Sequence, residues 1–414
     1  MLVDYVARTG FATVSTNIVR ELKKSYGSEL KLDIVAINYF GQPYQEDENT
    51  FVISGKLNDP KEDDFGRYFF LKLLKEDDYD GVFICQDLGV IVPVIEVMDF
   101  IKKEKKEQNR KSFKSIFYFP IDCIIIEELT RSLEFFDVLV TYTEFARNQV
   151  RRFRPELSVK VIPHGNNPKD FYPLPDEERL AFRKEYFEDN AEKYIITSVN
   201  RNQPRKDLVT TILGFEEIKK RIKYYRQQNR KSTLHDYDIR DDLFLYLHCH
   251  ASDPKGDDLR IVMKQTSLKE DVDYKLLPKR FEESGADVPT VNKIYNASDV
   301  VISTSLGEGW GLIFSEAVAC KVPIIAPYNT SYIEMSGRYG ERAYMIDSEY
   351  PCCVSNIIRT QCDIYDVADK IWEAVKEKGS ENQKKKIDAA YEWSQSLDWK
   401  IVCKQWIENF KIFR

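Results

Sequence analysis

Two glutamates flank a glycine-rich turn late in the chain, and their spacing suits the binding of hydroxyl groups. The segment GEGWGLIFSE, residues 307–316, holds Glu308 in the turn and Glu316 in the helix expected after it. Carboxylates accept paired hydrogen bonds from neighbouring hydroxyls. At a rise of ~1.5 Å per helical residue, the two acids reach points roughly 8–12 Å apart. This distance suits a sugar at one acid and a ribose at the other, with a diphosphate between them.

The same segment also suits a phosphate group. Gly307, Gly309 and Gly311 let the backbone approach a ligand closely. A helix is expected from Leu312 to Cys320, and its unbonded N–H groups and positive dipole end would face the turn. The purely structural alternative is a glycine turn followed by an acid that complements the helix dipole.

A second polar loop follows the expected strand YIITSVN, residues 194–200. It contains Arg201 and Lys206, with Arg205 between them, and precedes a helix that is expected to begin near Asp207. Cations at the end of a strand, beside a helix N-terminus, form a suitable site for a diphosphate. A solvated basic loop is the alternative reading of this segment.

The elements that must hold these loops alternate between strand and helix. The expected strands are mostly continuous apolar runs, as in strands buried on both faces: KLDIVAINY, GVFICQ, SIFYFP, DVLVTY, VKVIP, YIITSVN, LFLYLHC, DVVISTS, VPIIAP and AYMI. Helical patterns such as TVSTNIVRELKKSY, IEVMDFIKKEKKEQ and TEFARNQVRRF lie between them. This alternation predicts right-handed crossovers and parallel sheets.

A stretch rich in Pro, Asn and Gly near residues 164–175 has no apolar periodicity and is read as a linker. We therefore expect two doubly wound α/β domains, residues 1–165 and 166–396, facing a cleft. The aromatic C-terminal helix, about 397–414, is expected to pack back on the first domain. In such sheets ligands bind beyond the carboxyl ends of the strands, where both polar loops lie.

Composition excludes some classes of function. The net charge of −7 gives no basic field for nucleic acid, and no apolar run approaches the ~20 residues of a membrane span. The eight cysteines include no C-x-x-C pair, and the N-terminus lacks the layout of a signal peptide, so we expect reduced thiols in the cytoplasm. Basic runs at 102–114 and 219–231 are read as solvated helix ends, with contact to a membrane surface or a polyanion as the alternative.

These segments resemble retaining glycosyltransferases of the GT-B fold, particularly glycosyltransferase family 4 (glycosyl transferases group 1). GEGWGLIFSE looks like the E-x7-E motif of that family, VIPHGNNPKDFYP like its interdomain segment, and NRNQPRK like its Arg–Lys diphosphate clamp. The segment VNKIYNASDVVISTSLGEGWGLIFSEAVACKVPIIAP follows the family pattern nearly throughout. The resemblance is specific over about 165–395 and weaker before it.

The resemblance implies roles for the two loops. Glu308 would contact hydroxyls of the donor sugar, Glu316 would hold the ribose, and Arg201 and Lys206 would neutralise the diphosphate. Backbone N–H groups nearby would come from Gly309, Trp310, Gly311 and Leu312. The implied activity is the metal-independent transfer of a mannose- or glucose-type hexose from a GDP- or UDP-sugar to a hydroxyl of a glycan or lipid-linked sugar. We favour GDP-mannose-like donors; no separate cofactor or metal is expected.

In the first domain, Gly10 is expected to let the backbone approach the diphosphate, and Ser15 or Thr16 to cap the following helix. Paired glycines are common there in the family, whereas this chain has Gly10 alone. After the strand SIFYF the family often has a histidine, and this chain has Asp122 in the sequence PID. Asp122 is expected to orient the acceptor hydroxyl or take its proton. A helix N-cap is the alternative role for Asp122.

Two other classes of function stay open. A metal-dependent GT-A transferase needs a D-x-D motif, which occurs at 78–80, 236–238 and 271–273 in acid-rich polar segments where chance matches are common. A non-catalytic nucleotide-sugar-binding protein or scaffold would explain the altered acceptor-side motifs. The chain is short for a phosphorylase-like enzyme of the same fold.

Overall fold

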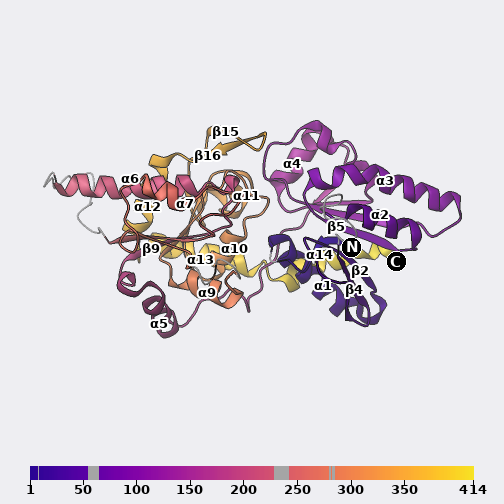
Figure 1. Ribbon diagram of the computed structural model, residues 1–414, viewed down its shortest axis with the longest axis horizontal. Helices are drawn as coiled ribbons and strands as arrows, with labels where there is room; N and C mark the ends of the chain where they lie inside the picture. Colours follow the sequence, from indigo (N-terminus) through magenta and orange to yellow (C-terminus); the bar gives the residue numbers. More distant parts are fainter. Residues whose placement is uncertain (8, 55–64, 228–241, 279–280, 282–284) are drawn as a thin grey trace. The chain divides into compact units, whose positions relative to one another are not determined.

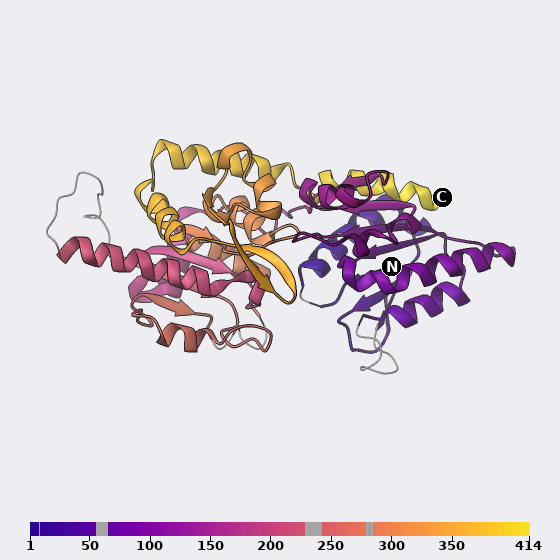
Figure 2. The ribbon, with the colours of Figure 1, turned by 90° about the horizontal axis from the view of Figure 1, so that it is seen from above.

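Figure 1 shows the computed structural model of the chain, which describes residues 1–7, 9–54, 65–227, 242–278, 281 and 285–414. The chain forms two compact units. Unit 1 comprises Met1–Gly165 together with Leu397–Arg414, and unit 2 comprises Asn166–Ser396. Figure 2 shows the same ribbon turned by 90°. In the described part of the chain, no helix is long and apolar enough to cross a membrane.

Unit 1 is built on a sheet in which every described strand pair is parallel except β3–β4. The strand order is β3-β4-β2-β1-β5-β6-β7-β8, so the sheet is wound in both directions from the boundary between β1 and β5. The strands are β1 (Leu2–Asp4), β2 (Leu32–Ile37), β3 (Tyr44–Asp47), β4 (Thr50–Ser54), β5 (Gly81–Cys85), β6 (Lys114–Phe119), β7 (Val138–Thr141) and β8 (Val159–Val161).

Helices cover both faces of this sheet. The longer ones are α1 (Gly10–Tyr26), α2 (Arg67–Glu76), α3 (Leu88–Glu107), α4 (Glu144–Phe153) and α14 (Trp399–Phe410). Short 3-10 turns are η1 (Gly27–Glu29), η2 (Glu127–Thr130), η3 (Leu133–Phe135) and η7 (Lys411–Phe413). Apolar residues of α2, α3 and α4 share one core with alternate strand residues. On the opposite face, the Phe83 ring lies 5.5 Å from Trp406 and 5.4 Å from Phe410 of α14.

Unit 2 contains a second sheet whose described strands are all parallel, in the order β11-β10-β9-β12-β13-β14. These strands are β9 (Tyr194–Val199), β10 (Leu243–His248), β11 (Tyr274–Leu276), β12 (Val300–Ile302), β13 (Ile324–Pro327) and β14 (Tyr344–Ile346). The winding direction reverses between β9 and β12. A separate antiparallel hairpin joins β15 (Tyr350–Val354) to β16 (Ile357–Gln361).

The helices of unit 2 again lie on both faces of the sheet. They are α5 (Asp176–Phe187), α6 (Leu208–Gln227), α7 (Leu259–Lys264), α9 (Val288–Ala297), α10 (Leu312–Ala319), α11 (Thr330–Met335), α12 (Ile364–Lys376) and α13 (Glu381–Gln395), with 3-10 turns η4 (Glu188–Asn190), η5 (Pro204–Lys206) and η6 (Arg338–Gly340). Residues of α6, α7 and α12 form one core with the sheet, and residues of α5 and α9 form another. The predicted α/β class with parallel sheets is confirmed.

The start of α1 differs from the expectation. The helix begins at Gly10, and the Thr9 hydroxyl caps it by accepting from the Ala12 N–H at 3.1 Å. Ser15 and Thr16 therefore do not cap the helix, because both lie inside it. Ser15 is fully buried, and the Thr16 hydroxyl donates back to the Ala12 carbonyl at 2.7 Å. This backward bond is the usual one for a hydroxyl in a helix interior.

The basic run at 102–114 is solvated, as expected, at four of its six lysines, Lys103, Lys106, Lys111 and Lys114, but not at the other two. Lys102 and Lys105 on α3 are both buried. The Lys102 ammonium pairs with Asp137 at 2.9 Å, and the Lys105 ammonium pairs with Asp78 at 2.7 Å. A buried ammonium group needs such a carboxylate partner. These two lysines thus hold α3 to neighbouring segments of unit 1 and are not part of an exposed basic surface.

We predict that Trp406→Ala lowers the free energy of unfolding of unit 1 by about 3–5 kcal/mol, as expected for the truncation of a buried aromatic side chain. Trp406 is 0% exposed, whereas Ile401 on the same helix is 49% exposed. The matched control Ile401→Ala is expected to change stability by no more than about 0.5 kcal/mol. Urea unfolding followed by circular dichroism measures both. Equal effects of the two substitutions would show that α14 is not an integral part of the core of unit 1.

Candidate functional site

Two loops meet at the point in unit 2 where the strand order reverses. One loop follows β9 and contains residues 200–207, and the other follows β12 and contains residues 303–311. The Leu306 N–H donates to the Arg205 carbonyl at 2.8 Å, so the loops contact each other directly. In open parallel sheets this position is the usual place for a ligand. Both loops were predicted from the sequence to bind a ligand.

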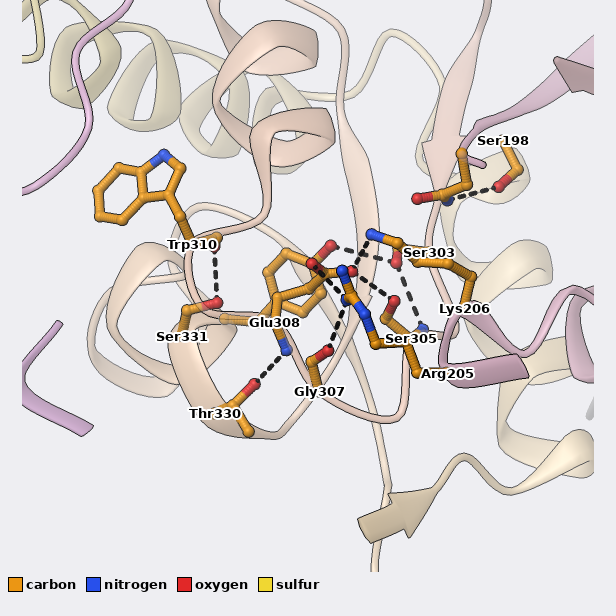
Figure 3. A network of polar contacts seen from close by, with 12 residues as sticks. Ser198, Arg205, Lys206, Ser303, Ser305, Gly307, Glu308, Trp310, Thr330 and Ser331 are labelled. Carbon is orange, nitrogen blue, oxygen red and sulfur yellow. Dashed lines mark hydrogen bonds and ion pairs between the residues drawn. The ribbon is translucent and has the colours of Figure 1, made fainter. Parts of the chain in front are cut away.

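A buried ion-pair cluster centred on Glu308 joins these loops (Figure 3). Lys206 Nζ donates to Glu308 Oε1, which also accepts from the Ser305 hydroxyl at 2.5 Å. Arg205 Nη1 donates to Glu308 Oε2 at 3.0 Å and to the Gly307 carbonyl at 3.2 Å. Both carboxylate oxygens are thus bound to a cation. We call Arg205, Lys206, Ser305 and Glu308 the Glu308 cluster.

The cations of the cluster keep Glu308 ionised. Only 5% of the residue is exposed, and burial by itself would raise its pKa. The nearby charges of Arg205 and Lys206 outweigh this effect and lower the pKa of Glu308 to about 2. The side chain therefore carries its negative charge throughout the physiological range.

The turn between Glu308 and α10 has a conformation that requires glycine at its last position. Gly311 has a φ of +97°, and a Cβ atom there would lie 2.5 Å from the Tyr332 ring. Leu312 is the first residue of α10, whose initial N–H groups lack partners within the helix. The Glu308 N–H itself donates to the Thr330 hydroxyl at 2.9 Å. Its own amide is therefore already engaged with α11.

Trp310 belongs to the packing of this turn. Its ring stacks on Trp393 of α13, with a centroid distance of 6.2 Å and an interplanar angle of 27°. Its carbonyl accepts from the Ser331 hydroxyl at 2.6 Å. The residue is 7% exposed, so its side chain supports the loop from inside unit 2. Gly309 lies between Glu308 and Trp310 in the same turn.

Glu316 lies within α10, in a less polar environment than Glu308. Its Oε2 accepts from the Tyr295 hydroxyl of α9 at 2.8 Å. Burial raises the pKa of Glu316 to about 7, with a smaller contribution from the negative charge of Asp170. The Tyr295 hydrogen bond acts in the opposite direction. The two glutamates therefore differ in charge near neutral pH, because only Glu308 has cationic partners.

Arg201 is separated from the Glu308 cluster. Its Nε donates to Asp253 Oδ2 at 2.9 Å, and its side chain is 57% exposed. The structure thus places Arg205, to which sequence reasoning assigned no role, beside Lys206 on the carboxylate. The sequence held no signal for this pairing, because side chains in an irregular loop follow no fixed period.

The remaining predicted site residues belong to unit 1. Gly10 is the first residue of α1, directly after the Thr9 cap. Asp122 is half-buried in the irregular segment after β6, and the 3-10 turn that follows is preceded by Ile126 at its N-cap. The alternative in which Asp122 caps a helix is therefore wrong.

A buried carboxylate that sequence reasoning missed lies at the switch point of the unit 1 sheet. Asp4 ends β1 and is 2% exposed. Its oxygens accept from the Asn38 side-chain amide at 2.9 Å and from the Thr9 hydroxyl at 3.0 Å. Burial raises its pKa, although both hydrogen bonds oppose the rise. Its position at the end of the first strand was the signal available from the sequence.

In the described D-x-D segments, Asp78, Asp80 and Asp273 are engaged in ion pairs. Asp78 pairs with Lys105 and Arg110, and Asp273 pairs with Lys219 at 2.9 Å. The segment at 236–238 lies outside the described residues. Among the residues that the structure describes, no three or more His, Cys, Asp or Glu side chains are arranged to hold a metal ion.

Comparisons with models of protein families and with curated proteins yield no match for this chain. Solved structures do match along nearly the whole chain. Sucrose-phosphate synthase from Thermosynechococcus elongatus is 15% identical with a TM-score of 0.66, covering 95% of this chain and 92% of that one. Anabaena HepE, in complex with UDP and glucose, is 14% identical with a TM-score of 0.65, covering 99% and 97%.

A glycosyltransferase from Rickettsia africae is also similar, with 14% identity and a TM-score of 0.68 over 99% of this chain and 96% of that one. At such low identities, similarity of structure establishes the fold. The two parallel sheets, each wound in both directions, agree with it. The chain therefore has the GT-B fold of these glycosyltransferases, built from two Rossmann-like domains.

Proposed function

We propose that this protein is a retaining glycosyltransferase that takes a hexose from a nucleotide-diphosphate sugar. The observation that carries the proposal is the Glu308 cluster at the β9/β12 switch point, with Glu316 on the adjoining helix. The cluster offers a carboxylate for sugar hydroxyls and an ammonium group for phosphate in one place. The similarity to glycosyltransferases of known structure agrees with this assignment.

In the proposed donor site, α10 and the turn before it bind different parts of the nucleotide sugar. Glu308 accepts hydrogen bonds from the sugar, and Glu316 accepts them from the ribose. Lys206 and Arg201 neutralise the diphosphate. Backbone N–H groups at the start of α10 assist these cations, because a helix N-terminus favours negative charge. The N–H groups proposed for this task are those of Gly309, Trp310, Gly311 and Leu312.

The proposed reaction substitutes one oxygen for another at the anomeric carbon of the sugar. The bond from this carbon to the diphosphate oxygen breaks, and a bond to the acceptor hydroxyl oxygen forms on the same face, so configuration is retained. The proton of the acceptor hydroxyl passes to the departing diphosphate. Lys206 and the helix N-terminus stabilise the charge that develops on the leaving group. In this proposal no metal ion is needed for that task.

Unit 1 is proposed to bind the acceptor, a hydroxyl of a glycan or lipid-linked sugar. Asp122 is proposed to orient this hydroxyl, and the backbone at Gly10 to approach the diphosphate. The sequence favours GDP-mannose-like donors, whereas the similar HepE structure holds UDP and glucose. The identity of the nucleotide base in the donor therefore has to be measured. A thermal-shift screen with UDP, GDP, ADP and their hexose conjugates compares the candidates, because a bound ligand raises the melting temperature.

A non-catalytic nucleotide-sugar-binding protein is the second candidate. It is favoured by one observation, that Asp122 occupies the position after β6 where the resembled family often has a histidine. The two candidates differ in turnover. Tight binding of a nucleotide sugar, with neither transfer to a panel of acceptors nor hydrolysis of the donor, would select the binding protein.

The charged groups of the Glu308 cluster can be tested by substitution. Lys206→Ala and Glu308→Gln are each expected to lower the rate of sugar transfer about 10²–10³-fold, the usual cost of losing one oriented group that stabilises the transition state. Lys376→Ala, at an exposed position on α12, is the matched control. Radiolabelled donor and a chromatographic product assay measure the rates. Near-native rates in both cluster variants would contradict the proposed site.

Nucleotide binding is expected to change the protonation of Glu316. Hydroxyl groups that donate to its carboxylate stabilise the ionised form, so nucleotide binding should lower its pKa from about 7 and release a proton. Affinity for nucleoside diphosphate should therefore rise between pH 6 and 8, as the free site loses its proton. Calorimetry at pH 6.5 in two buffers of different ionisation enthalpy measures the released proton.

Glu316→Gln is the control, since it removes the titrating carboxyl group of Glu316. The titration of the nucleotide phosphate is unchanged in this variant. Glu185→Gln, an exposed substitution on α5, should behave like the native protein. If native protein and Glu316→Gln release the same number of protons, Glu316 does not contact the ribose.

A further inference from the structure

Arg205 makes three contacts with the turn that carries Glu308. Its backbone carbonyl accepts from the Leu306 N–H at 2.8 Å. Its Nη1 donates to the Gly307 carbonyl at 3.2 Å and to Glu308 Oε2 at 3.0 Å. One residue of the β9 loop thus binds three consecutive residues of the β12 loop. Figure 3 shows the bonds of its side chain to Gly307 and Glu308. Such contacts fix both the path of the turn and the orientation of the carboxylate.

The two carboxylate oxygens of Glu308 have different partners. Oε1 accepts from Lys206 and from Ser305, whereas Oε2 accepts from Arg205. The Lys206 side chain is 13% exposed and that of Arg205 is 33% exposed. From α11, the Tyr332 hydroxyl adds a neutral group whose own pKa is raised by burial and by the charge of Glu308. In this cluster, only Arg205 and Lys206 supply positive charge.

On the proposed function, on which this inference rests, Lys206 has two tasks that compete. A diphosphate attracts its ammonium group, so the bond to Glu308 Oε1 weakens when the donor binds. A buried carboxylate without a cation is costly and tends to take up a proton. A protonated Glu308 would accept hydrogen bonds from the sugar hydroxyls less well than the carboxylate does. A second cation that stays on Glu308 removes this conflict.

We propose that Arg205 is a positioning residue, which holds Glu308 ionised and directed at the donor sugar while Lys206 turns to the diphosphate. Arginine suits the task because one guanidinium nitrogen serves a carbonyl and a carboxylate at the same time. A lysine in its place keeps the charge but offers a single point of contact. The proposal thus separates Arg205, which acts on the sugar end, from Lys206, which acts on the phosphate end.

The test compares the affinity for a nucleotide with that for its sugar conjugate. Isothermal titration of the full chain uses UDP with UDP-glucose and GDP with GDP-mannose. In Arg205→Gln, affinity for the nucleoside diphosphate is expected to stay within about threefold of the native value. The additional affinity contributed by the sugar should fall about tenfold, as for the loss of a charge-assisted hydrogen bond. Arg205→Lys should restore part of it.

A pH profile gives a readout that a merely structural role would leave unchanged. Since Arg205 lowers the pKa of Glu308, its removal should move the acid limb of donor hydrolysis or transfer to higher pH. The profiles are compared in a Glu316→Gln background, because the titration of Glu316 near pH 7 would otherwise set that limb. Arg205→Lys should move the limb partly back. Arg179→Gln removes a partly exposed arginine of α5 that pairs with Asp176, and it serves as the matched control. Circular dichroism checks the fold, and Arg205→Lys carries the test if Arg205→Gln does not fold.

Equal losses of affinity for nucleotide and nucleotide sugar in Arg205→Gln would overturn the proposal, because Arg205 would then be a diphosphate ligand. An unchanged pH profile with an unchanged sugar contribution would overturn it as well. These outcomes require that the native protein binds a nucleotide. If the native chain binds none of the four probes, the proposed function itself fails, and the role of Arg205 fails with it.

Discussion

The ion pairing of Glu308 with Lys206 and Arg205 is the interaction on which the rest of the candidate site depends. A carboxylate that is only 5% exposed needs cations to stay ionised, and both come from the loop after β9. These bonds join two loops whose sequence positions differ by about a hundred residues. The helix α10, which carries Glu316, begins directly after the turn that holds Glu308. The parallel order of β9 and β12 brings the loops together at one sheet edge.

Much of this fold follows from the sequence. Runs such as YIITSVN and VPIIAP are continuous apolar segments, and the structure confirms them as parallel strands buried in unit 2. Once strands and helices alternate, the polar loops that follow the strands must lie at the carboxyl edge of the sheet. The sequence therefore placed Glu308 and Lys206 on neighbouring loops. Their direct pairing did not follow from spacing.

The predictions from the sequence that were wrong or incomplete have local physical causes. Side chains in an irregular loop have no fixed period, so nothing in the spacing of Arg201, Arg205 and Lys206 tells which of them faces Glu308. Thr9 and Ser15 are both residue types that cap helices well, so residue type alone did not distinguish them. Gly10, which follows Thr9, is a poor helix former, so the sequence did not indicate that α1 begins there. Lys105 looked solvated because its acidic partner, Asp78, lies far away in the sequence and pairs with it only after folding.

In the proposed complex a nucleotide sugar binds across the two loops joined by Glu308. Hydrogen–deuterium exchange of the native chain, with and without a nucleotide sugar that raises its melting temperature, locates the bound ligand. Slower exchange is expected for backbone amides in residues 200–207 and 305–316, because the ligand contacts both loops and the start of α10. Binding that slows exchange elsewhere in the described chain, but in neither loop, would show that the ligand does not occupy this site.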